Sequence, residues 1–227
     1  MKSIKILFTV LISILMSTGC KKDHNDENKT EKPFVITEFF VGGTLTPASK
    51  SYTSVFFINF LENNKAVFIS SGNNLTGDYI LTDNELVFEV KDPNNYRLVK
   101  FSLDKDKKIT SAYYKALTTE YAATGDLIPV TESNQLSGKT FKGEEFKMGP
   151  VTNRQGLIYN FNKTSTTYGS GTEAATIDNT LNSYTLINGC AFKYVNGSTT
   201  ELGFVTNKKL TVFRYSGLYY FGKYDQQ

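Results

Sequence analysis

The chain has 227 residues, with 25 Lys and Arg residues against 22 Asp and Glu residues, two Cys and a single His. This near-neutral charge, with lysines spread among the acids, excludes an electrostatic argument for nucleic-acid binding. A single His excludes a histidine-based catalytic triad, a histidine metal cluster and a pair of haem ligands. We therefore predict no cofactor.

Residues 1–19 have the order of a secretory signal peptide. Lys2 and Lys5 provide the positive start, Ile6–Met16 form an apolar run of about eleven residues, and small residues follow. A membrane-spanning helix needs roughly 20 apolar residues, so this run predicts a cleaved signal and not a permanent span. Its removal takes two lysines and no acid, leaving 23 basic against 22 acidic residues and a net charge of +1.

The small residues Thr18 and Gly19 stand directly before Cys20. This pattern resembles the lipobox of Bacteroidetes-type bacterial lipoproteins, although Ser17 stands where the family prefers Leu. The resemblance implies lipid addition at the sulfur of Cys20, cleavage before it and acylation of the new amine. Two or more acyl chains would anchor the protein stably in a membrane. The alternative is an ordinary secreted protein with a coincidental cysteine.

Residues 20–33 are polar and lack an apolar period, which predicts a flexible tether with His24 as a solvated linker residue. Within the tether, Lys21–Glu27 resemble the lysine-then-acid signal with which some Bacteroidetes lipoproteins reach the cell surface. We therefore expect an outer-membrane protein displayed at the surface. A periplasm-facing protein on a plain solvated linker is the alternative.

Beyond Pro33, short runs rich in aromatic and β-branched residues alternate with turns rich in Asn, Asp, Gly and Lys, which predicts strands and hairpins. Arg97–Leu103 and Glu85–Val90 show the two-residue period of strands with one face in a core. Val55–Leu61 are apolar on both faces, which indicates a strand covered on both sides. Asn188-Gly189 and Asn196-Gly197 predict tight hairpin turns.

The chain also repeats itself at an offset of about 101–105 residues, which predicts two copies of one unit at residues 34–130 and 135–227, joined by Thr131–Asn134. We expect an all-β fold of two tandem antiparallel meanders with about seven short strands each. The alternatives are two small barrels or sandwiches, or two half-barrels that form one larger barrel. The matched segments are Phe57–Phe60 with Ile158–Phe161, Gly77–Asp83 with Asn182–Asn188, Leu98–Phe101 with Glu201–Phe204, and Lys107–Thr110 with Lys208–Thr211.

The second copy opens with Leu136-x-Gly138 and ends with Gly217–Lys223. This frame resembles the lipocalin-like lipoprotein domains of Bacteroidetes, and the resemblance implies an up-and-down sheet around a ligand cup. The Gly-x-Trp signature of true lipocalins is missing, because the chain contains no Trp.

Few residues offer catalytic or metal-binding chemistry. Cys190 has no histidine in the folded part to activate it, so we interpret it as a small buried apolar residue. Asp104-x-Asp106 superficially matches the start of a calcium loop, but Lys105, Lys107 and Lys108 stand where further oxygen ligands are needed. We interpret this segment as a charged hairpin tip.

Two pairs of carboxylates are the remaining candidates for acid and base roles. Glu144 and Glu145 are neighbours on a strand and should therefore face opposite ways. Asp83 and Glu85 flank a predicted turn. We interpret all four as solvated surface residues and predict a protein that is not an enzyme.

Aromatic pairs are the candidate contact residues. Tyr113-Tyr114 and Tyr219-Tyr220 should each place one phenol on each face of a sheet, where an exposed ring could contact a ligand or partner. The alternative, which we favour for the aromatic residues in general, is core packing, because aromatic side chains suit strands. The predicted function is a lipid-anchored, extracytoplasmic, non-catalytic protein that binds a small apolar ligand or a protein. The alternative is an accessory or immunity-type subunit that docks on another envelope protein.

Overall fold

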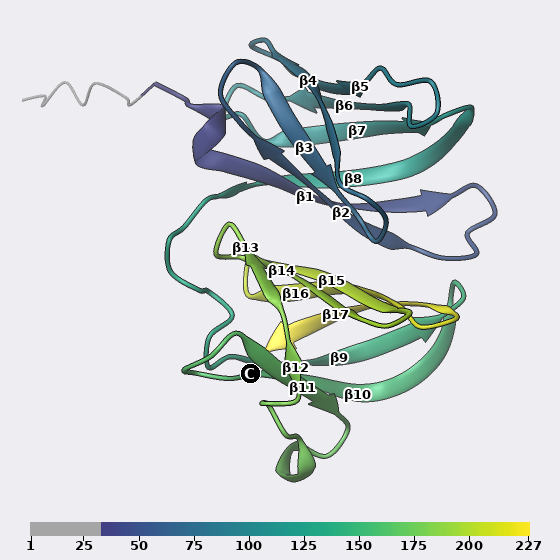
Figure 1. The fold of residues 1–227 in the computed structure, drawn as a ribbon, viewed down its shortest axis with the longest axis vertical. Coiled ribbons are helices and arrows are strands. Elements are labelled where there is room, and N and C mark those ends of the chain that lie inside the picture. Colours follow the sequence, from purple (N-terminus) through teal and green to yellow (C-terminus); the bar gives the residue numbers. More distant parts are fainter. Residues whose placement is uncertain (1–32) are drawn as a thin grey trace, which may run out of the picture. The chain divides into compact units, whose positions relative to one another are not determined.

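The computed structural model describes residues 33–227, of which Val35–Gln227 form one compact unit (Figure 1). The predicted signal peptide, Cys20 and His24 lie outside the described residues. The all-β prediction is confirmed, because the helices among the described residues are two 3-10 turns, Ile36–Glu38 (η1) and Ala174–Thr176 (η2). None of the helices in this range is long and apolar enough to cross a membrane.

The first sheet is a closed antiparallel barrel in which each strand pairs with its neighbours in sequence (Figure 1). The barrel closes because β1 pairs with β8 as well as with β2. Its eight strands, within residues 33–227, are β1 (Phe39–Pro47), β2 (Ser54–Phe60), β3 (Lys65–Ile69), β4 (Leu75–Leu81), β5 (Glu85–Val90), β6 (Arg97–Leu103), β7 (Ile109–Ala116) and β8 (Thr119–Pro129).

The second sheet is a nine-stranded antiparallel meander in which β9 pairs with both β10 and β17. Its edge strands are β12 and β13, and Tyr184 is the one residue between them in the chain. They therefore act as a single interrupted strand, which pairs with β11 on one side and with β14 on the other. The strands are β9 (Thr140–Lys147), β10 (Val151–Phe161), β11 (Thr167–Gly171), β12 (Asn182–Ser183), β13 (Thr185–Ile187), β14 (Ala191–Asn196), β15 (Thr199–Thr206), β16 (Lys209–Tyr215) and β17 (Tyr219–Gln226).

Two separate barrel-like sheets form, and the alternative of two half-barrels sharing one larger barrel is wrong. The reason is pairing: the eighth strand satisfies the free edge of the first strand and leaves no edge for the second sheet to extend. Each sheet also has one strand more than the expected seven, when β12 and β13 are counted together.

The repeated segments fall on equivalent strands of the two sheets. With β12 and β13 counted as one strand, the four matches lie on the second, fourth and sixth strands and on the turn before the seventh strand. In that turn, Lys107 and Lys208 both adopt a left-handed backbone, with φ of 60° and 61°. The sequence repeat therefore corresponds to a repeat of connectivity and of turn conformation.

Aromatic side chains fill the interiors of both sheets. In the first barrel, Phe68 stacks on Phe56 and on Tyr114, with ring centroids 5.4 and 5.8 Å apart. The residues of β5 and β6 that were predicted to face inward are buried, and they alternate with more exposed residues along each strand. The interior cluster of the second sheet has as its largest members Phe141, Tyr159, Phe161, Tyr168, Phe192 and Tyr224.

A third core lies between the two sheets and consists of outward-facing residues of both. Phe57 of β2 meets Phe204 of β15 edge to face, with ring centroids 6.2 Å apart, and both are buried. This contact explains the two apolar faces of β2, because Phe56 points into the barrel while Phe57 packs against the second sheet. At the margin, Asn188 donates from Nδ2 to Oδ1 of Asn59 at 2.7 Å.

Candidate functional site

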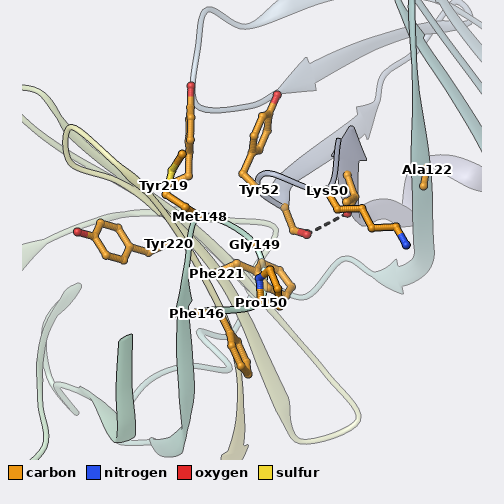
Figure 2. Close-up of a pocket in the computed structure, with 12 residues that line it drawn as sticks. Lys50, Tyr52, Ala122, Phe146, Met148, Gly149, Pro150, Tyr219, Tyr220 and Phe221 are labelled. Carbon is orange, nitrogen blue, oxygen red and sulfur yellow. Dashed lines mark hydrogen bonds between the residues drawn. The ribbon is translucent and has the colours of Figure 1, made fainter. Parts of the chain in front are cut away.

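An open cleft of about 540 Å³ lies between the turn after β1, the turn after β9 and the start of β17 (Figure 2). This volume lies within the range of small-molecule sites. Most of the lining is apolar, and its larger side chains are Tyr52, Phe146, Met148, Tyr219, Tyr220 and Phe221.

Strand register places the aromatic side chains of the second sheet on the cleft. Phe146 of β9 pairs directly with Phe221 of β17, and two residues earlier on the same strand Tyr219 pairs with Tyr215 of β16. Side chains two residues apart on a strand share one face. The outer face of this sheet therefore presents neighbouring aromatic rings to the cleft.

The first barrel contributes Tyr52 from the loop between β1 and β2. Its ring lies beside that of Tyr219 (Figure 2). The two rings stack with centroids 4.5 Å apart and planes 24° from parallel. Burial, with the neighbouring phenols of Tyr121 and Tyr219, raises the pKa of Tyr52 to about 12. The Tyr52 hydroxyl therefore stays protonated and neutral at physiological pH.

The two turns at the cleft touch through their backbones. Gly149 follows Met148 in the turn after β9, with φ of +88°, and a Cβ there would lie 2.7 Å from the carbonyl oxygen of Lys50. Within the second sheet, the amide of Met148 donates to the carbonyl oxygen of Tyr219 at 2.9 Å, which ties the turn after β9 to the start of β17. Only a residue without a side chain fits at this approach, so Gly149 sets the distance between the turns.

Polar groups on the cleft are few. Thr46 and Thr53 bond to each other through their hydroxyls, 2.9 Å apart. Among the described residues, Lys50 is the one charged side chain in the lining, and it forms no ion pair or side-chain hydrogen bond within that part of the chain. The described lining residues include no carboxylate, and their chemistry is suited to holding an apolar molecule.

A second cluster lies inside the second sheet, where Glu145 is 1 % exposed. Arg154 donates from Nε to Oε2 and from Nη2 to Oε1 of Glu145, both at 3.0 Å, and Arg214 donates from Nη2 to Oε1 at 2.7 Å. Burial acts to raise the pKa of Glu145, but the hydrogen bonds and charges of both arginines outweigh it and hold the pKa below its usual range.

The interpretation of Glu145 as a solvated surface residue is therefore wrong. Glu144 and Glu145 do face opposite ways, and Glu144 is exposed as expected. Strand alternation predicts this divergence, but it does not show that the inner face carries arginines that can neutralise a buried carboxylate. Asp83 and Glu85 are exposed, in agreement with their interpretation.

Glu201 of β15 is the other buried carboxylate of this cluster. Its Oε2 accepts a hydrogen bond from Tyr168 at 2.7 Å, and Nε of Arg214 lies 3.7 Å from its Oε1. Burial is the largest influence and raises the pKa of Glu201. Both carboxylates are buried and engaged by protein groups, so neither is presented to the cleft.

The structure brings two of the four candidate tyrosines to the cleft. Tyr219 lies with its ring at the cleft, while Tyr220 borders the cleft with its ring turned away (Figure 2). Arg214 lies over the ring of Tyr220, with its Cζ 4.0 Å from the ring centroid. Tyr113 and Tyr114 lie on β7, where Tyr113 pairs with the cleft residue Ala122 of β8, but neither tyrosine is itself among the described lining residues. Tyr113 is half-buried and donates to Glu120 at 2.7 Å, while Tyr114 is buried inside the first barrel.

Sequence reasoning did not identify Tyr52, Phe146 or Lys50. Two signals were available in the sequence: Tyr52 is an aromatic residue in a polar turn, and Phe146 is an apolar residue beside two glutamates. Neither signal points to the other, because these residues belong to different sheets and meet only after packing.

The other candidate groups remain structural. Cys190 is buried in the core between the sheets, and burial raises the pKa of its thiol. Asp104 accepts hydrogen bonds from the amides of Asp106 and Lys108, which is the arrangement of a hairpin tip. Among the described residues, no group of three or more His, Cys, Asp or Glu side chains could hold a metal ion.

A comparison of the chain with protein-family models, with curated proteins and with solved structures finds no match.

Proposed function

We propose that the protein is a lipid-anchored, extracytoplasmic binding protein that holds a small apolar ligand in the cleft between Tyr52 and Phe221 and catalyses no reaction. The observation that carries this proposal is the cleft itself, with aromatic rings from both sheets and about 540 Å³ of space. Apolar and aromatic linings of this size suit small ligands, whose burial is driven by the hydrophobic effect.

The filled interiors favour this location over the cup inside a barrel that the lipocalin-like resemblance implies. Buried aromatic residues such as Phe56, Phe88 and Phe101 occupy the first interior, and Tyr159 and Phe161 occupy the second. A ligand inside either sheet would have to displace these side chains, whereas the cleft needs no such rearrangement.

The test is the binding of N-phenyl-1-naphthylamine, a neutral probe that fluoresces in apolar surroundings. We expect saturable binding, weakened by about tenfold in Ala122→Phe, because the new ring occupies the cleft without removing a core residue. Ala175→Phe, at an exposed position in η2, is the matched control and should bind as the native protein does. Equal binding by both variants would show that the cleft is not the site.

Docking on another envelope protein is the second candidate, and exposed apolar residues favour it. Met148 (40 % exposed), Val151 (60 %) and Leu218 (37 %) stand on the turns beside the cleft. Single exposed apolar residues are common, but a group of them beside an apolar cleft is typical of contact surfaces. Co-purification from the native envelope, followed by mass spectrometry of proteins and extracted lipids, separates the candidates: a stoichiometric protein supports docking, and an enriched small apolar molecule supports ligand binding.

A further inference from the structure

The cleft carries one uncompensated positive charge at its edge. Lys50 is exposed, and its side chain forms no ion pair with the residues that the structure describes. Elsewhere in that range, several exposed lysines have partners, such as Lys65 with Asp78 and Lys209 with Asp225. Lys50 therefore adds a cation to an apolar lining that contains no described carboxylate to neutralise it.

The backbone around Lys50 is held in place, so the position of this charge is defined. The amide of Lys50 donates to the carbonyl oxygen of Pro47 at 2.8 Å, which closes the turn after β1. Its own carbonyl oxygen lies against Gly149 of the opposite turn. Figure 2 shows the side chain extending toward Ala122, along the edge of the cleft.

The hydroxyl of Tyr52, which also lines the cleft, carries no charge that would repel an anion. The pKa of Tyr52 is raised to about 12, so its phenol is neutral when an acid of ordinary pKa is fully ionised. A carboxylate beside Lys50 would accept a charge-assisted hydrogen bond, while an attached apolar body would contact Phe146, Tyr219 and Phe221.

We infer that the cleft selects an apolar molecule that carries one carboxylate, with the carboxylate bound by the Nζ of Lys50 and the apolar body bound by the aromatic lining. This inference rests on the proposed function and names the class of ligand for the same site. Lysine acts here as a compact, flexible point charge, which suits one acidic group at the edge of an apolar surface.

The experiment compares dodecanoate with dodecan-1-ol by titration calorimetry on the purified protein. Both have the same apolar chain, but only dodecanoate is charged. Lys50→Met should weaken dodecanoate binding by about fivefold, which is the scale of an exposed ion pair, and leave dodecan-1-ol binding unchanged. Lys50→Arg should retain dodecanoate binding, and Lys100→Met, at an exposed position on β6, should change neither ligand.

Ionic strength is the second readout. Raising it from about 0.01 M to about 1 M shortens the screening length from about 30 Å to about 3 Å, which should weaken dodecanoate binding but not dodecan-1-ol binding. The inference is overturned if both ligands bind and Lys50→Met changes them equally or changes neither. If neither ligand binds saturably to the native protein, the proposed function fails as well.

Discussion

Glu145 of β9 and Arg214 of β16 form an ion pair, with 2.7 Å between Oε1 and Nη2, although β17 lies between their strands in the sheet. The residue of β17 that pairs with Glu145 is Gly222. Because Gly222 has no side chain, the hydroxyl of Tyr224 can occupy the space beside it, where a Cβ would lie only 2.3 Å from that hydroxyl. This glycine lets charged and phenolic side chains of the neighbouring strands converge over it.

Removal of the Glu145 charge should destabilise the fold strongly. In Glu145→Gln, Arg154 and Arg214 lose the carboxylate that compensates them in a largely buried site, and loss of one partner from such a pair costs about 3–5 kcal/mol. The free energy of unfolding in urea measures the effect. Glu144→Gln is the matched control, since this exposed neighbour should change stability by less than about 0.5 kcal/mol. Similar losses in the two variants would mean that the internal ion pair does not form.

The two buried carboxylates should have opposite effects on the pH dependence of stability. The pKa of Glu201 is raised by burial in the folded state, so its contribution is complete below the ordinary value of 4.5 and is lost as pH rises through the folded pKa. The pKa of Glu145 is lowered, so its contribution is present above 4.5 and is lost as pH falls through the folded pKa.

Glu201→Gln isolates the first of these effects. Its amide oxygen can still accept the hydrogen bond from Tyr168, but it has no charge to desolvate as pH rises. We expect the variant to lose less stability than the native protein between about pH 4 and about pH 8, as measured by urea unfolding at each pH. Parallel stability curves for the two proteins would contradict a raised pKa at Glu201.

The packing of the two sheets against each other predicts energetic coupling between Phe57 and Phe204. Their rings meet at 89°, and aromatic pairs of this geometry contribute about 0.5–1.5 kcal/mol beyond the area that they bury. A double-mutant cycle with alanine, based on unfolding free energies, should return a coupling of this size. The pair of Phe57 with Phe161, which lies inside the second sheet, is the control and should be additive within about 0.5 kcal/mol.

The sequence predicts that Cys20 carries the lipid anchor. Cys20→Ala should release the protein from the membrane fraction into the soluble fraction, since the acyl chains supply the membrane affinity. Cell fractionation with detection of the protein in each fraction measures this change. The other cysteine gives the control, because Cys190→Ala alters a buried core position and should leave the protein in the membrane. Retention of the Cys20→Ala variant in the membrane would rule out lipidation at this residue.

Local patterns were sufficient to predict several strands and turns. The two-residue period in β5 and β6 identifies the buried rows correctly, because a strand turns alternate side chains to opposite faces whatever the rest of the chain does. Asn188 and Gly189 form the expected tight turn, with φ of 51° and 72°. The repeat predicts two similar units, and the equivalent left-handed turns at Lys107 and Lys208 agree with it.

Only the tertiary structure decided what lies against each strand face. Alternation predicts that Glu145 and Glu144 diverge, but the stability of a buried carboxylate depends on Arg154 and Arg214, which come from other strands. The cleft is not predictable for the same reason, since Tyr52 and Tyr219 meet through packing between sheets and not through any local period. A single sequence therefore determines which residues share a face, whereas the partners of that face follow from strand pairing and sheet packing between distant segments.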